Sequence, residues 1–88
     1  MAGGSQVEMF VVYILFSDKL NKYYVGSTNN LEDRMYRHNS GQGKFTKKGI
    51  PWRLIATIEQ KTRPEAVRLE VKIKKRGIKR YLEDNDLI

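Results

Sequence analysis

Two short segments rich in β-branched and aromatic residues lie close together near the start of the chain, and they restrict its fold more than any other feature. MFVVYILF occupies residues 9–16, and YYVG occupies residues 23–26. Such residues favour strands, and the intervening SDKLNK supplies the Ser, Asp and Asn typical of a turn. The pattern predicts an antiparallel hairpin, on which the rest of the chain must pack.

A helix-start signal follows the hairpin. Asn30 stands as an N-cap before Leu31, and Asp33 three positions on resembles a capping box. Gly41 supplies the left-handed residue that commonly ends a helix. The spacing predicts a helix from Leu31 to about Asn39, followed by a Gly-rich basic loop.

A third strand is predicted for residues 52–60, WRLIATIEQ. Its apolar and polar residues alternate from Trp52 to Ile58, the period-two pattern of a half-buried strand, and only Ile55 breaks the alternation. We expect the even-numbered residues to face one core.

Two further helices are predicted after this strand. Thr62 is an N-cap, Pro64 lies in the first turn, and Glu65 occupies the capping-box position, while Gly77 ends the first of the two. A last short helix is expected over residues 78–88, IKRYLEDNDLI. The inward residues are predicted to be Ala66, Leu69 and Ile73 on the first of these helices and Ile78, Tyr81 and Leu82 on the second.

The order β-β-α-β-α-α describes an α+β domain, a small sheet with helices packed against it. The 88 residues suffice for one modest core. We expect residues 9–88 to form this single domain and residues 1–8 to be a disordered tail or a remnant of cloning. No run approaches the roughly 20 apolar residues of a membrane span.

Charge is distributed unevenly and points to a polyanionic partner. The chain carries a net +7, but the segment from Arg34 to Arg80 holds 15 Lys or Arg against three Glu, a net +12. Such a surface attracts nucleic acid, although a solvated basic face that aids solubility remains the alternative. An anionic membrane surface fits less well, because the cations are not gathered on one amphipathic helix.

The chain has no cysteine, which removes disulfides, thiolate nucleophiles and Cys-based zinc sites. This composition is compatible with a reducing cytosol, and we expect a cytoplasmic protein.

Polar residues share a helical face with apolar ones on the first helix. Leu31, Arg34, Met35 and His38 are spaced i, i+3, i+4 and i+7 and therefore lie on one side. Arg34 and His38 either belong to a site or lie at the margin of the buried stripe with their polar ends in water.

Glu70 is a lone acid in a strongly basic helix. It either pairs with Lys74 at i+4 or serves as a carboxylate ligand for Mg²⁺, which is often bound by one or two carboxylates with water and phosphate oxygens. The strand tyrosines are similarly open to two interpretations, since strands favour Tyr for packing alone. They are Tyr13, Tyr23 and Tyr24.

Taken together these residues resemble the GIY-YIG nuclease superfamily, in particular its small stand-alone bacterial members. The two name motifs correspond to Val11-Val12-Tyr13 and Tyr24-Val25-Gly26. Valine replaces Gly and Ile in the first motif and Ile in the second, exchanges that alter strand packing rather than chemistry. The resemblance covers about residues 9–85.

The resemblance implies a three-stranded antiparallel sheet flanked by helices and metal-dependent hydrolysis of DNA with Mg²⁺ or Mn²⁺. It also implies roles for individual residues. The catalytic positions are Tyr13, Tyr24, Arg34 and His38, the metal carboxylate is Glu70, and a looser match places a supporting residue at Asn85.

On this hypothesis the protein is an endonuclease with little base-sequence specificity that acts on structured or damaged DNA, as in DNA repair. Tyr13 would orient or deprotonate the attacking water, with nearby cations lowering the pKa of its phenol. A non-catalytic basic nucleic-acid-binding module on the same fold is the alternative, and a plain basic structural domain is a third. Contacts to flanking phosphates are expected from Lys44, Lys47, Lys48, Lys72, Lys75 and Arg76.

Overall fold

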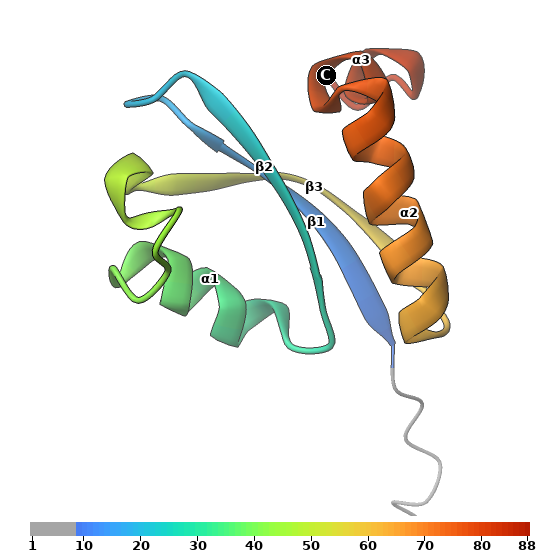
Figure 1. Ribbon diagram of the computed structural model, residues 1–88, viewed down its shortest axis with the longest axis horizontal. Coiled ribbons are helices and arrows are strands. Elements are labelled where there is room, and N and C mark those ends of the chain that lie inside the picture. The colour runs from blue at the N-terminus through green and yellow to red at the C-terminus, as the bar shows by residue number, and fades with distance from the viewer. Residues whose placement is uncertain (1–8) are drawn as a thin grey trace, which may run out of the picture.

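The element order matches the α+β prediction. A computed structural model describes residues 9–88, so the expectation for residues 1–8 lies outside the described part of the chain. The elements are β1 (Phe10–Ser17), β2 (Lys22–Thr28), α1 (Leu31–Asn39), a 3₁₀ helix η2 (Lys47–Gly49), β3 (Trp52–Gln60), α2 (Arg63–Arg76) and α3 (Ile78–Asp84) (Figure 1).

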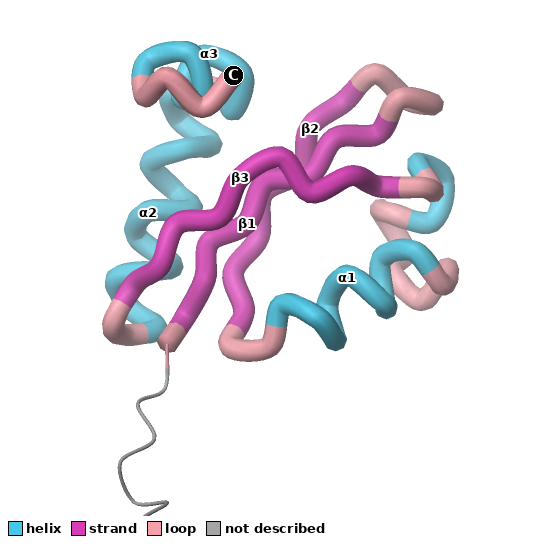
Figure 2. The backbone as a smooth tube through the Cα atoms, turned by 180° about the vertical axis from the view of Figure 1, so that it is seen from behind, coloured by secondary structure: helices cyan, strands magenta, loops and turns pink. Residues whose placement is uncertain are grey.

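The three strands form one antiparallel sheet in the order β2-β1-β3. α2 and α3 cover one face of this sheet, and α1 with the following loop covers the other, as seen from both sides in Figures 1 and 2. Residues on β1 therefore feed two separate cores, because successive side chains of a strand point to opposite faces. Within residues 9–88 no helix combines the length and hydropathy needed to cross a bilayer.

The larger core lies between the sheet and the α2–α3 pair, and the inward residues predicted for these helices all contribute to it. Leu69, Ile78 and Tyr81 pack against its edge. Its fully or nearly buried members are Phe10, Val12, Ile14, Val25, Ala66, Ile73 and Leu82.

The smaller core lies under α1 and holds the residues of functional interest. Tyr13, Leu15 and Trp52 form it, and Leu31 and Met35 of α1 pack against it. Two hydrogen bonds of the Asn39 amide hold the edge of this core together. The Asn39 side chain accepts from the Trp52 backbone N–H at 2.7 Å and donates to the Trp52 carbonyl at 3.3 Å, tying the end of α1 to the start of β3.

β3 does not present its even-numbered residues to one core, so that expectation is wrong. The pairing with β1 shifts register between Ile14 and Leu15, so that Ile55 is an extra residue on β3. The resulting bulge turns Trp52 toward α1 while Ile58 packs on the α2 side. The one break in the sequence alternation was the sign of this bulge.

The helix boundaries follow their capping residues. The Asn30 side chain accepts from the Asp33 N–H at 3.1 Å, and Thr62 forms the predicted capping box with Glu65. The predicted last helix is shorter than expected, because α3 ends at Asp84 rather than continuing toward residue 88.

Candidate active site

Tyr13 reaches from the central strand across the edge strand because Gly26 has no side chain. The two residues are paired between β1 and β2. A Cβ at Gly26 would lie 2.6 Å from the Tyr13 Oη and 2.8 Å from its Cζ, far inside van der Waals contact. The ring of Tyr13 therefore lies flat over the backbone of Gly26. Its hydroxyl is carried to the β2 edge of the sheet, although Tyr13 itself is fully buried.

His38 holds the Tyr13 hydroxyl from above. Its Nε2 lies 2.9 Å from the Tyr13 Oη, and its Nδ1 lies 3.0 Å from the Thr46 Oγ1. Both ring nitrogens are thus hydrogen-bonded in either tautomer of the neutral imidazole. His38 is only 7% exposed, so the alternative that its polar end lies in water is wrong.

Burial dominates the ionisation of both groups. Desolvation raises the pKa of the Tyr13 phenol, Tyr24 adds to the rise, and the hydrogen bonding and charge of Arg34 act in the opposite direction. The prediction that cations lower this pKa is therefore wrong, because burial disfavours the phenolate more than Arg34 stabilises it. Burial, followed by the charge of Arg34, lowers the pKa of His38 from its usual 6.5. At neutral pH the pair is a protonated phenol and a neutral imidazole.

The lowered pKa of His38 predicts a loss of stability in mild acid. The folded protein binds the imidazole proton less tightly than the unfolded chain, whose pKa is 6.5. The free energy of unfolding should be unaffected by this group above that pH, and it should fall as the pH drops from there toward the folded pKa. Urea titrations from pH 8 to pH 5 measure the slope, which should be flatter in His38→Gln. Equal slopes in the two proteins would contradict the assignment.

Tyr24 and Arg34 form the accessible side of the cluster, since both are half-buried. The Tyr24 ring centroid lies 6.4 Å from that of Tyr13 and 5.1 Å from that of His38. Beside them is a hollow of about 260 Å³ that two arginines and His38 help to line. The residues lining it are Arg34, Arg37, His38, Gln42 and Gly43.

Glu70 approaches the same edge of the sheet from the opposite face. It lies on α2, and its Oε1 accepts from the Ser27 hydroxyl of β2 at 3.0 Å. Its Oε2 accepts from Lys74 at 3.0 Å, which confirms the predicted i+4 pair. The Glu70 charge also contributes to raising the pKa of Tyr13, so the carboxylate and the phenol are electrostatically coupled. The carboxylate remains 21% exposed and is not walled off.

The donor set around Glu70 restricts the kind of metal it could hold. In residues 9–88 no three His, Asp or Glu side chains gather into a ready-made metal site. One half-buried carboxylate fits Mg²⁺ or Mn²⁺, hard cations that retain waters and complete their coordination with phosphate oxygens. The residues present therefore fit a cation that shares its ligands with a bound phosphodiester.

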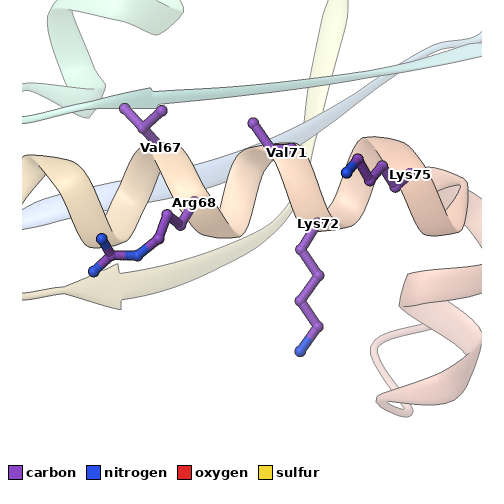
Figure 3. Close-up of a pocket in the computed structure, with 5 residues that line it drawn as sticks. All are labelled: Val67, Arg68, Val71, Lys72 and Lys75. Carbon is purple, nitrogen blue, oxygen red and sulfur yellow. The ribbon is translucent and has the colours of Figure 1, made fainter.

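The predicted phosphate-binding cations occupy two separate regions. Lys44, Lys47 and Lys48 are exposed on the loop after α1, and the others lie on α2 across the sheet. Two residues of α-helix turn a side chain by about 200°, so Lys72 points away from Glu70. Figure 3 shows Lys72 extending from the outer side of α2, with Lys75 one turn further on.

The remaining two predicted residues have intramolecular partners. Arg76 pairs with Asp84 through two contacts of 2.6 and 3.1 Å, which offsets its charge. The Asn85 side-chain amide donates to the Tyr81 carbonyl at 2.8 Å and so caps the end of α3. A role of Asn85 beside Glu70 stays a prediction.

Two residues of this cluster were missed from the sequence. Ser27 lies just beyond the strand segment expected at residues 23–26, but it is part of β2, and its position next to Gly26 was the available signal. Thr46, which is 2% exposed, had no signal at all, since only the folded loop brings its hydroxyl to His38.

This constellation of two strand tyrosines, a helix arginine and histidine, and a carboxylate from a later helix matches a known family. The model of the GIY-YIG catalytic domain matches residues 9–81. Because that match spans nearly the whole described chain, the protein belongs to the GIY-YIG nuclease family.

Its relatives are small bacterial proteins. UPF0213 protein YsiG of Lactococcus lactis is 36% identical over 93% of this chain and 82% of the relative. UPF0213 protein YazA of Bacillus subtilis is 39% identical over 75% of this chain and 71% of the relative. The solution NMR structure of UPF0213 protein BH0048 from Bacillus halodurans has 31% identity and a TM-score of 0.56, covering 90% of this chain and 84% of that one. The names of these relatives state no activity.

Proposed function

We propose that the protein is a metal-dependent DNA endonuclease that hydrolyses phosphodiester bonds with little base-sequence specificity. The observation that carries the proposal is the convergence of Tyr13, Tyr24, Arg34 and Glu70 on the β2 edge, with His38 behind them. Membership of a nuclease family and the net charge of +7 support it. The site is accessible at this edge, since Tyr24, Arg34 and Glu70 are each only half-buried.

Arg34 is the group best suited to the phosphate. Its guanidinium is a cation that presents a fork of donors matching phosphate oxygens. It lines the hollow together with Arg37, which is paired with Asp33 at 3.0 Å, and the hollow leaves room beside Arg34 for a phosphate. The contact should strengthen as negative charge develops on the phosphate during attack.

The buried hydrogen-bond chain offers a route for the proton of the attacking water. A protonated Tyr13 cannot accept that proton unless its own proton leaves, and His38 Nε2 lies 2.9 Å away to receive it. The neutral imidazole is the form that can accept, and burial together with Arg34 favours that form. Thr46 fixes the ring through Nδ1. Tyr24 lies over the open side, where it can orient the water.

Glu70 would hold the metal, together with water and phosphate oxygens. A bound Mg²⁺ or Mn²⁺ would supply Lewis-acid stabilisation of charge on the phosphate. Ser27 positions the carboxylate by donating to one oxygen, and Lys74 occupies the other.

Structured or damaged DNA is the proposed substrate class. Little base-sequence specificity is expected, because the proposed cations would contact phosphates rather than base edges. Binding should weaken steeply as salt rises, since each neutralised phosphate releases counterions. The proposal also includes a cytoplasmic location and a role in DNA repair.

The experiment is cleavage of supercoiled plasmid and of branched DNA with Mg²⁺, with Mn²⁺ and with EDTA. Nicking is expected with either metal and none with chelator. Because no group of three candidate ligands gathers within residues 9–88, calorimetry should detect metal binding only weakly without DNA and more tightly with an uncleavable duplex. Salt-dependent binding with no nicking under any metal would favour the non-catalytic module.

A further inference from the structure

One side chain of the loop after α1 is exposed in a way that packing does not explain. Phe45 is 89% exposed, the highest value among the large apolar side chains of residues 9–88. An aromatic ring left in water gives up the burial that would stabilise the fold by about 2 kcal/mol. Its neighbour Thr46 is by contrast almost fully buried.

The backbone that carries Phe45 is fastened on both sides. The Thr46 hydroxyl bonds to His38 at 3.0 Å, and the Thr46 carbonyl accepts from the Trp52 indole at 2.6 Å. The Lys47 N–H donates to the Gly43 carbonyl at 3.0 Å. Phe45 is thus presented outward from an anchored turn.

The surroundings of the ring are basic. Lys44, Lys47 and Lys48 are all exposed, and residues 41–52 contain no acidic residue. An exposed aromatic ring among lysines is the combination that binds unpaired nucleotides, with the ring stacking on a base and the lysines contacting the backbone. A base within a continuous duplex is stacked on both sides and cannot use such a ring without unstacking.

We propose that Phe45 stacks on an unpaired nucleobase next to the scissile phosphate, so that the protein prefers DNA with single-stranded or branched segments over continuous duplex. This inference rests on the proposed function and narrows its substrate class. The loop is joined to the reacting groups through one residue, because Thr46 binds the same imidazole that holds Tyr13. Gln42 and Gly43 of the same loop line the hollow at Arg34, so a base stacked on Phe45 would belong to a strand that passes this hollow.

The test measures binding alone, in EDTA, with a single-stranded oligonucleotide, a splayed fork and a blunt duplex of equal length. Phe45→Ala should weaken binding of the single strand and the fork by roughly 10-fold to 100-fold and leave the duplex within about twofold. Phe45→Trp should retain the affinity, and stacking on a base of the single strand should quench the fluorescence of the new indole. Trp52 is buried, so its emission should stay constant as background.

Tyr36→Ala is the matched control. Tyr36 is 67% exposed, but it lies in a hollow with Glu32 and Asp33 that no lysine or arginine lines. Its removal should change no affinity. Unchanged single-strand binding in Phe45→Ala, or an equal loss for all three DNAs, would overturn the inference. If the binding effects appear but the wild type does not nick DNA, the role of Phe45 in binding stands and the proposed nuclease activity is rejected. If the wild type nicks DNA and Phe45→Ala binds all three DNAs as the wild type does, the nuclease activity stands and the role of Phe45 is rejected.

Discussion

Glu70→Gln should abolish nicking while DNA binding is retained. The amide is isosteric with the carboxylate and can still accept from the Ser27 hydroxyl, so the β2 edge keeps its geometry. It loses the negative charge needed to hold a divalent cation. A rate loss on the order of 10²–10³-fold or more is expected, comparable to removing one electrostatic contact of a transition state. Plasmid nicking and fluorescence anisotropy with the same DNA measure the two properties.

A matched control and two variants of Arg34 accompany this test. Glu59→Gln removes an exposed acid on β3 and should leave nicking unchanged. Arg34→Ala should lower the rate by a similar 10²–10³-fold, and Arg34→Lys should recover little, because an ammonium does not reproduce the guanidinium fork. Full nicking by Glu70→Gln would remove the carboxylate from the proposed mechanism.

Gly26→Ala should damage both stability and activity. Its methyl group would fall 2.6 Å from the Tyr13 Oη, which forces the buried ring to move. Overpacking of this kind costs about 1–3 kcal/mol of unfolding free energy. Displacing the hydroxyl from His38 by even about 1 Å should lower the cleavage rate on the order of 10²-fold. Thermal unfolding measures the loss of stability, and nicking assays below the melting temperature measure the loss of cleavage rate.

Gly77→Ala separates the two effects. Gly77 joins α2 to α3 with φ of 95°, so alanine is strained there by about 1–2 kcal/mol. Its Cβ would meet no clash, because the nearest side-chain atom, Arg80 Cδ, would be 3.9 Å away. This variant should lose stability and keep its nicking activity. If Gly26→Ala proved as active as Gly77→Ala, the placement of Tyr13 over the edge strand would have no bearing on the reaction.

The fold was predictable because its signals are local. Caps at Asn30 and Thr62 and the two strand segments of the hairpin fixed the elements to within a few residues. The bulge at Ile55 was visible only as a broken alternation, and its effect on the facing of β3 depends on pairing with β1. The end of α3 was extended too far, since the helix stops at Asp84 and the left-handed φ of 55° at Asp86 turns the chain away.

The sequence named candidate residues of which some are in contact in the structure, but it did not predict their electrostatics. The family resemblance named Tyr13 and His38, and the structure places them in contact. Whether cations or burial would decide the pKa of Tyr13 depended on how completely α1 covers it, which no spacing in the sequence reveals. The same holds for Thr46, whose hydroxyl meets the imidazole only through the fold of a Gly-rich loop.

The bulge in β3 has a consequence for how this chain tolerates changes in length. Even-numbered residues of this strand reach both cores only because Ile55 shifts its register, with Trp52 on one side and Ile58 on the other. Deleting Ile55 itself would remove the bulge and keep the pairing on either side of it, so Trp52 and Ile58 would stay in their cores. Deleting Thr57 would instead place Ile58 opposite Tyr13, on the face that α1 covers. Homologues that differ in length should therefore carry the change at the bulge or outside this strand, in segments such as the turn between β1 and β2.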